Sequence, residues 1–371
     1  MAENDELAVK RQQLKTEIKS GKYKSLGGFM IDGVGQLVQK IPFSKKQPPF
    51  WYNSSIFALL TMLVCLLVST VFGGKAPILS EEEAWRIMIT GFLGILLAPL
   101  TVIVGIMMHR KLLTILDSEI IEAIETQDNL DDLRHWLAKT FNLKSELIKS
   151  LVPAAVFFYT LLYLREIFSE VHLGAGVYLV AIIAGFEVLT ALSVFLASFA
   201  LLYRLSQYQL KLFAIDPSSS KVIDRLSEMI NSIMVVTAVF LTIISILAFV
   251  GNPLAVSILL LLPWIVILGV FINSHYALSK IIRKSKWQIL ADIQSQIESL
   301  QAKSEIISEE TLNHINKLMD YHNRIRATRN SAIDIRSGFS LLQSILLPVI
   351  GLLSANLLNI LDIISRISMG K

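Results

Sequence analysis

One carboxylate, that of Glu187, lies near the centre of a long apolar stretch, YLVAIIAGFEVLTALSVFLASFALLYRL at residues 178–205. A charge at the centre of a membrane span costs about 2.5 to 3.5 kcal/mol, so an acidic side chain there must face protein or water. A neutral carboxyl group would donate a structural hydrogen bond to another helix. An ionised one would bind a cation or relay a proton along a wet path. No Lys, Arg or His in another apolar stretch offers a partner, and both interpretations stay open.

A second group of polar side chains falls in the apolar stretch at residues 338–360. Its amides, Gln343, Asn356 and Asn359, favour a protein or water neighbour over lipid. Hydrogen bonds between helices explain them, and so does a surface that faces a pore. Together with Glu187, these amides form the candidate intramembrane polar site.

Patterns typical of enzymes are missing from the sequence. It contains no glycine-rich phosphate loop, no Gly-x-Ser-x-Gly elbow and no His-Glu-x-x-His pair. His314 and His322 lie eight residues apart, but no third metal ligand is set by spacing. The acidic segment at residues 117–132 lacks the glycine turn of a calcium loop, and we interpret it as a solvated helix face with a cap. We therefore expect no enzymatic activity, no metal site and no cofactor.

The composition of the chain is typical of a membrane protein. The chain of 371 residues is 53% hydrophobic and only 17% charged, against about 25% charged in an ordinary soluble domain. The formal charge of +4 would suit nucleic acid, but basic membrane proteins gather Lys and Arg in their inner loops. We expect the lipid bilayer as a partner and no nucleic acid. The single cysteine, Cys65, excludes an intramolecular disulfide.

We predict an all-α, polytopic membrane protein with about seven transmembrane helices. Strong candidates, each near the 20 apolar residues that a span needs, lie at residues 55–73, 87–108, 174–203, 229–250, 255–274 and 338–360. A seventh candidate, 149–168, is weaker. Seven spans with the N-terminus inside and the C-terminus outside place 29 of the 34 Lys and Arg residues on the inner side. This orientation agrees with the positive-inside rule and favours a multi-pass protein of the plasma membrane.

The segment before the first span predicts a helix in the headgroup plane. In FMIDGVGQLVQKIPF, at residues 29–43, the apolar side chains share one helical face. The following Phe50, Trp51 and Tyr52 suit the aromatic belt at a membrane interface, and we expect them to act as anchors. A short helix that packs on the inner loops is the alternative interpretation.

Two inner loops have the periodicity of helical hairpins. The first, residues 109–149, continues the stripe of the second span and returns through Leu130, Leu133 and Leu137, after a cap at Asp128 or Asn129. The second, residues 275–337, resembles a coiled coil in pattern, and its apolar stripe needs a partner. We expect this stripe to act in assembly through Ile289, Ile293, Ile297, Leu300, Leu312, Ile315 and Met319.

The predicted organisation is an N-terminal segment (1–52), two spans (53–108), the first cytoplasmic hairpin (109–149), four spans (150–274), the second hairpin (275–337), and a last span with a short tail (338–371). The leading functional hypothesis is an oligomeric ion-conducting channel that is gated or assembled through the hairpins. A membrane-anchored scaffold or sensor, whose hairpins recruit a cytoplasmic partner, is the alternative. A secondary transporter ranks third because no paired half-repeats are visible.

Overall fold

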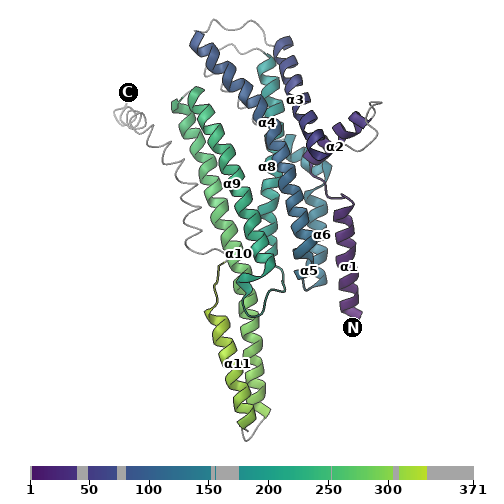
Figure 1. Cartoon of the computed structure of the whole chain (residues 1–371), viewed down its shortest axis with the longest axis vertical. Coiled ribbons are helices and arrows are strands. Elements are labelled where there is room, and N and C mark those ends of the chain that lie inside the picture. Colours follow the sequence, from purple (N-terminus) through teal and green to yellow (C-terminus); the bar gives the residue numbers. More distant parts are fainter. Residues whose placement is uncertain are drawn as a thin grey trace, which may run out of the picture.

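The structure, a computed structural model, describes residues 2–39, 49–72, 81–151, 155, 175–251, 253–303 and 309–331. Helices make up nearly all of this part of the chain, and they form one elongated bundle (Figure 1). Its only β-contact within those ranges is an isolated bridge between Ile124 and Leu210. Gln343, Asn356 and Asn359 lie outside the described residues.

The long helices confirm the all-α prediction, and their length and composition are compatible with a membrane protein. They are α3 (Phe50–Phe72), α4 (Glu81–Ile115), α8 (Ala175–Leu205), α9 (Lys221–Gly251) and α10 (Pro253–Lys303). In the part of the chain that the structure describes, four helices are long and apolar enough to cross a membrane, through the stretches Phe50–Val68, Ile95–Ala123, Gly185–Leu205 and Lys221–Thr242. The count of seven stays a prediction, because the candidate at 338–360 and nearly all of that at 149–168 lie outside the described residues.

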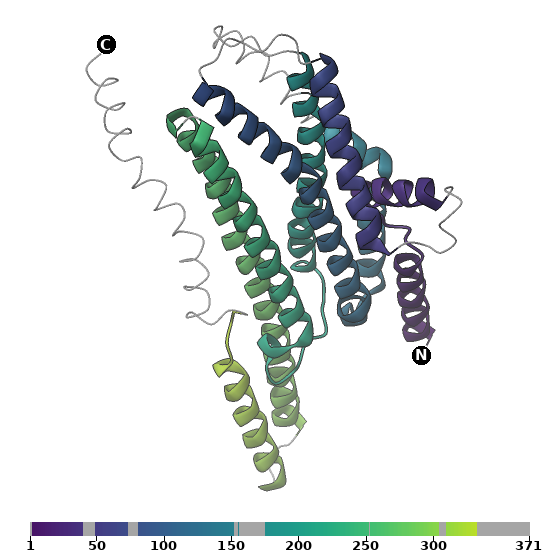
Figure 2. The ribbon, with the colours of Figure 1, turned by 45° about the horizontal axis from the view of Figure 1, so that its top comes forward.

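Small residues let α4 and α8 approach each other closely. A Cβ atom added at Gly105 of α4 would lie 3.1 Å from the Cα atom of Ala191 on α8. In lipid, where apolar side chains gain little from leaving the solvent, such close backbone contact is a main source of helix association. Pro99 lies inside α4 and removes one of its backbone hydrogen bonds, and the first part of α4 leans away from the rest in Figure 2.

Shorter helices pack against one end of the long helices in a unit that we call the α1–α6 body. It comprises α1 (Ala2–Lys19), the π-helix η1 (Leu116–Ile120) and α5 (Ile121–Ala123) that continue α4, and α6 (Gln127–Thr140). The predicted stripe residues Leu130, Leu133 and Leu137 are at most 2% exposed. The cap of α6 is Thr126, two residues before Asp128 and three before Asn129, the two predicted caps, and its side chain accepts from the N–H of Asn129.

The loop after α8 closes this body from the other side. It carries the short 3-10 helix η2 (Pro217–Ser219), and its backbone meets the turn before α6, where the N–H of Lys211 donates to the oxygen of Ala123 at 2.7 Å. One apolar core runs through α1, α6 and the adjoining parts of α4, α8, α9 and α10. The segments predicted to be inner loops between residues 109 and 228 are therefore structured parts of the fold.

At the far end of α10, α11 (Glu309–Ala327) lies beside it (Figure 1). Leu290, Ile293 and Ile297 of α10 form a buried cluster with Ile315 and Ile325 of α11, and Ile289 and Leu300 pack against it. Part of the predicted assembly stripe thus finds its partner within the chain. The remaining two members differ, since Leu312 is 48% and Met319 is 51% exposed.

Candidate functional site

Glu187 is buried in the bundle. It lies on α8, its side chain is 2% exposed, and its hydrogen-bonding neighbour is Thr61 on α3. The Thr61 hydroxyl lies 3.0 Å from the backbone oxygen of Phe57, to which it donates its single proton. Its oxygen can then accept a hydrogen bond from Glu187 only when that carboxyl group is protonated.

Glu187 lines a groove, and its second carboxyl oxygen is buried beside it. This atom, Oε2, is buried and has no hydrogen-bond partner among the described residues. The groove has a volume of about 530 Å³ and lies between α2 (Leu26–Gln39), α3 and α8. Leu60 and Val64 on its α3 side are each 45% exposed, so it opens sideways, where lipid would lie. Apart from Thr61 and Glu187 its lining is apolar: Met30, Val34, Phe57, Leu60, Val64, Leu151, Ile182, Ile183 and Phe186.

Helix α2 forms one wall of this groove and lies across the foot of α3 (Figure 2). Met30 and Val34 face the groove, whereas Ile31 packs against Val102 and Ile106 of α4. At Gly27, an added Cβ atom would approach Val102 to 3.0 Å, which shows how closely α2 sits on α4. The helix predicted for this segment is therefore present, and it is packed onto the bundle by one face.

The segment before α2 is fixed to the α1–α6 body by buried polar groups. The Nε2–H of His109 on α4 donates to the backbone oxygen of Tyr23, and the N–H of Leu26, the first residue of α2, donates to the carboxylate of Glu146. Glu146 belongs to the helical segment 143–151 and is 2% exposed. Burial raises the pKa of its carboxyl group to about 7.

Charged residues attach α1 to the acidic segment at residues 117–132. The Nζ of Lys10 lies 2.8 Å from a carboxylate oxygen of Asp131, and that of Lys19 lies 3.4 Å from one of Asp117. Lys15 pairs with Glu122 in the same way. The acidic segment, which we interpreted as a solvated helix face, is thus partly covered by α1, whose lysines pair with it.

A further ion pair closes the unit. Arg134 of α6 donates to both carboxylate oxygens of Glu17 on α1, and the Tyr23 hydroxyl donates to the same carboxylate. The Arg134 hydrogen bond is the main cause that lowers the pKa of Glu17 to about 2. These groups join α1, α6 and the segment before α2 into one polar junction, which is buried at Tyr23 and partly exposed at Arg134.

The predicted anchors divide into two kinds. Trp51 and Tyr52 are 61% and 50% exposed, as a lipid interface requires. Phe50 instead packs inward, and the guanidinium of Arg110 lies 4.0 Å from the centre of its ring. Sequence reasoning found Glu187 and these aromatic residues but missed Thr61 and the wall from α2, because Thr and Met carry no signal of their own in an apolar stretch.

Within the described ranges, no three His, Cys, Asp or Glu side chains are grouped to hold a metal ion. No known protein family, curated protein or solved structure matches the chain. The function must therefore be argued from the geometry of the groove and of the α1–α6 body.

Proposed function

We propose that the protein is a membrane-embedded sensor, in which a lipophilic molecule from the bilayer occupies the Glu187 groove and changes how the α1–α6 body binds a partner. The observation that carries this proposal is a groove that is apolar except for Thr61 and Glu187, together with the buried Oε2 atom of Glu187, which has no hydrogen-bond partner among the described residues. A buried polar atom without a partner costs about 1–3 kcal/mol, and a ligand that pairs with it recovers this free energy.

The lining selects the chemistry of the ligand. An apolar groove of about 530 Å³ is in the range of small-molecule sites. One hydroxyl or amine at the end of an apolar chain would pair with Glu187 while the chain lies against Leu60, Val64 and Phe186. Long-chain alcohols and amines are the simplest molecules that fit this description.

Helix α2 supports the coupling between groove and body. Its Met30 and Val34 line the groove, and its first residue, Leu26, is bonded to Glu146. Its approach segment is bonded through Tyr23 to His109. A ligand that displaces Met30 or Val34 therefore acts on a helix whose other end is part of the α1–α6 body.

An oligomeric ion channel is the second candidate. The presence of one acidic group deep in the bundle favours it, because an ionised Glu187 would attract cations in a wet path. The described groove is less favourable, since Thr61 and Glu187 are its only polar side chains. The homo-oligomer, the recruitment of a cytoplasmic partner by residues 275–337 and the plasma membrane location are parts of the proposal. Nothing in the groove favours a transporter.

Photolabelling in lipid nanodiscs tests the sensor. A long-chain alcohol with a diazirine in its chain should label peptides of α3 and α8 around Leu60 and Phe186. The Glu187→Leu variant should lose most of this labelling, whereas Val188→Ala, a change at the 40% exposed neighbour, should keep it. Labelling spread evenly over all lipid-facing helices, and unchanged by Glu187→Leu, would contradict the proposal.

Ion flux in proteoliposomes separates the two candidates. A channel that uses Glu187 should conduct, and Glu187→Gln should reduce its cation flux because the amide carries no charge. The sensor requires no flux, and Glu187→Gln should keep alcohol labelling because an amide still offers hydrogen bonds. Cation flux that the variant reduces, together with absent labelling, would favour the channel.

A further inference from the structure

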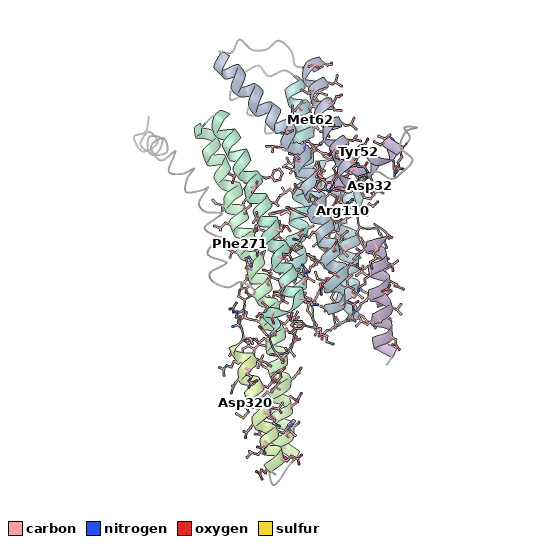
Figure 3. The ribbon with its side chains drawn as sticks, in the orientation of Figure 1. Asp32, Tyr52, Met62, Arg110, Phe271 and Asp320 are labelled. Atoms are coloured by element: carbon pink, nitrogen blue, oxygen red, sulfur yellow. The ribbon has the colours of Figure 1, made fainter. Side chains whose placement is uncertain are left out.

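A second pocket lies on the other side of α2, away from Glu187. Its volume is about 490 Å³, and it is bounded by α2, the first turn of α3 and α4. Unlike the Glu187 groove, it is lined mainly by polar side chains: Lys24, Asp32, Gln36, Gln39, Asn53 and Arg110. Figure 3 shows Asp32 on α2 and Arg110 on α4 in this region beside the foot of α3.

The two cations of this pocket, Lys24 and Arg110, differ in their partners. Lys24 pairs with Asp32, with 2.7 Å between nitrogen and oxygen. Arg110 lies over the ring of Phe50 and has no acidic partner in the described part of the chain. A guanidinium presents five N–H donors, so stacking on an aromatic ring leaves its edge able to bind an anion. The pocket therefore carries one positive charge that the described residues do not neutralise.

Asn53, which also lines the pocket, carries a further polar acceptor. The Oδ1 atom of Asn53 is buried and has no hydrogen-bond partner within the described ranges. The side chain of Asn53 is held against α2 at Gly35, where an added Cβ atom would lie only 2.7 Å from Nδ2. Thus the pocket offers an anion site at Arg110 and, separately, an acceptor that requires a donor from outside the described chain.

The position of the pocket along the bilayer normal indicates which molecule would supply such a ligand. Phe50, which lines it, is the first residue of the apolar stretch Phe50–Val68. The exposed Trp51 and Tyr52 follow directly, and exposed aromatic residues gather at the headgroup level of a bilayer. The abundant anion at that level is the lipid phosphate group, which arginine binds through paired N–H donors.

We propose that this pocket binds the headgroup of an anionic phospholipid whose headgroup also carries hydroxyl groups, from the leaflet on the α1 side. Arg110 holds the phosphate group, with Lys24 beside it, and the Asn53 oxygen accepts from a headgroup hydroxyl. Phosphatidylglycerol has both features, whereas phosphatidylcholine has the phosphate group but no headgroup donor. The site is separate from the Glu187 groove and does not depend on its proposed ligand.

Native mass spectrometry of the full chain, released from nanodiscs with equal amounts of the two lipids, tests this site. The parent should retain phosphatidylglycerol in preference to phosphatidylcholine. Arg110→Gln should lower that retention about tenfold, as expected for the loss of a charge-assisted hydrogen bond. Arg110→Lys should fall between the two because it keeps the charge but loses the paired donors.

Lys111→Gln is the matched control, since it removes the same charge one residue further along α4 and pairs outside the pocket, with Glu228. It should retain lipid like the parent. Unchanged retention in Arg110→Gln, or equal retention of both lipids by the parent, would overturn the proposal. Displacement of the lipid by an excess of soluble glycerol phosphate would also overturn it, because the pocket would then be a site for free phosphate esters.

Discussion

The imidazole of His109 on α4 and the backbone of Tyr23 are joined by a hydrogen bond of 2.7 Å, across 86 residues of sequence. A carbonyl oxygen only accepts, so Nε2 carries the proton, and the buried Nδ1 has no partner in the described residues. The ring also packs on Phe141, with 4.3 Å between ring centres. One side chain thus holds the connection between α1 and α2 on the membrane bundle.

Replacing His109 by Ala should loosen this connection. The variant loses the bond to Tyr23 and the contact with Phe141, and we expect a loss of about 1–3 kcal/mol in unfolding free energy. Limited proteolysis near residues 20–25 and thermal unfolding in detergent would measure it. His135→Ala, at an exposed position of α6, is the control. Equal cleavage rates in both variants would show that His109 does not hold the segment.

The Glu17 and Arg134 pair predicts a weakening of α1 in acid. Because the pKa of Glu17 is lowered to about 2, its contribution is complete above the ordinary carboxyl pKa near 4.5 and is lost as the pH falls toward 2. Arg134→Gln should remove about 0.5–1 kcal/mol of α1 docking at neutral pH, a modest value because Arg134 is partly exposed. The rate of hydrogen exchange in α1 should then rise about 2- to 5-fold. Lys139→Gln is the control, and equal exchange rates in the two variants would show that Arg134 does not hold α1 on α6.

Glu146 predicts a pH dependence of opposite sign. Its pKa is raised to about 7 by burial, so the neutral form fits the folded protein and stability falls as the pH rises from about 4.5 through 7. At about 1.36 kcal/mol per pKa unit, the loss is roughly 3 kcal/mol at most. Glu146→Gln keeps the shape without the charge. Melting temperatures from pH 5 to 8 should decline in the parent and be flatter in this variant; equal slopes would rule out Glu146 as their cause.

Lys286 predicts a local effect at α11. Its buried ammonium donates to the backbone oxygens of Arg326 and Thr328 and to the side chain of Asn330, at 2.7 to 2.9 Å. A cation there also opposes the negative end of the helix dipole. Lys286→Met should therefore speed hydrogen exchange in α11 about tenfold, equivalent to roughly 1.4 kcal/mol. Lys280→Met, at an exposed site on α10, should not do so.

Orientation in the membrane can be tested with single cysteines. In a Cys65→Ala background, cysteines at Glu82 and Lys303 should react with an impermeant maleimide from opposite sides of sealed vesicles, because the distribution of Lys and Arg predicts an inner α10 end. Intact and permeabilised vesicles give the comparison. Reaction of both positions from the same side would reject the predicted topology.

Hydropathy predicted α3, α4, α8 and α9 because a helix that crosses a bilayer needs about 20 apolar residues in a row. Such a run can be recognised from the local sequence alone. The docking of α1 was not predictable in the same way. Lys10 meets Asp131 across 121 residues, and either charge alone looks like part of a solvated face. Likewise, Leu312 follows the helical stripe of α11, but only the packed structure shows that it lies outside the cluster.

Helix α10 is continuous over 51 residues, from Pro253 to Lys303. At 1.5 Å per residue it is a rod of about 75 Å. It packs along α9, and its end carries α11. A tilt of only about 5° at the membrane end would displace the far tip by roughly 6–7 Å on this length. A small tilt of the bundle end of α10 is therefore seen as a larger displacement at α11. A measured distance between α11 and α1 would report rearrangements of the long helices that are too small to detect within the bundle itself.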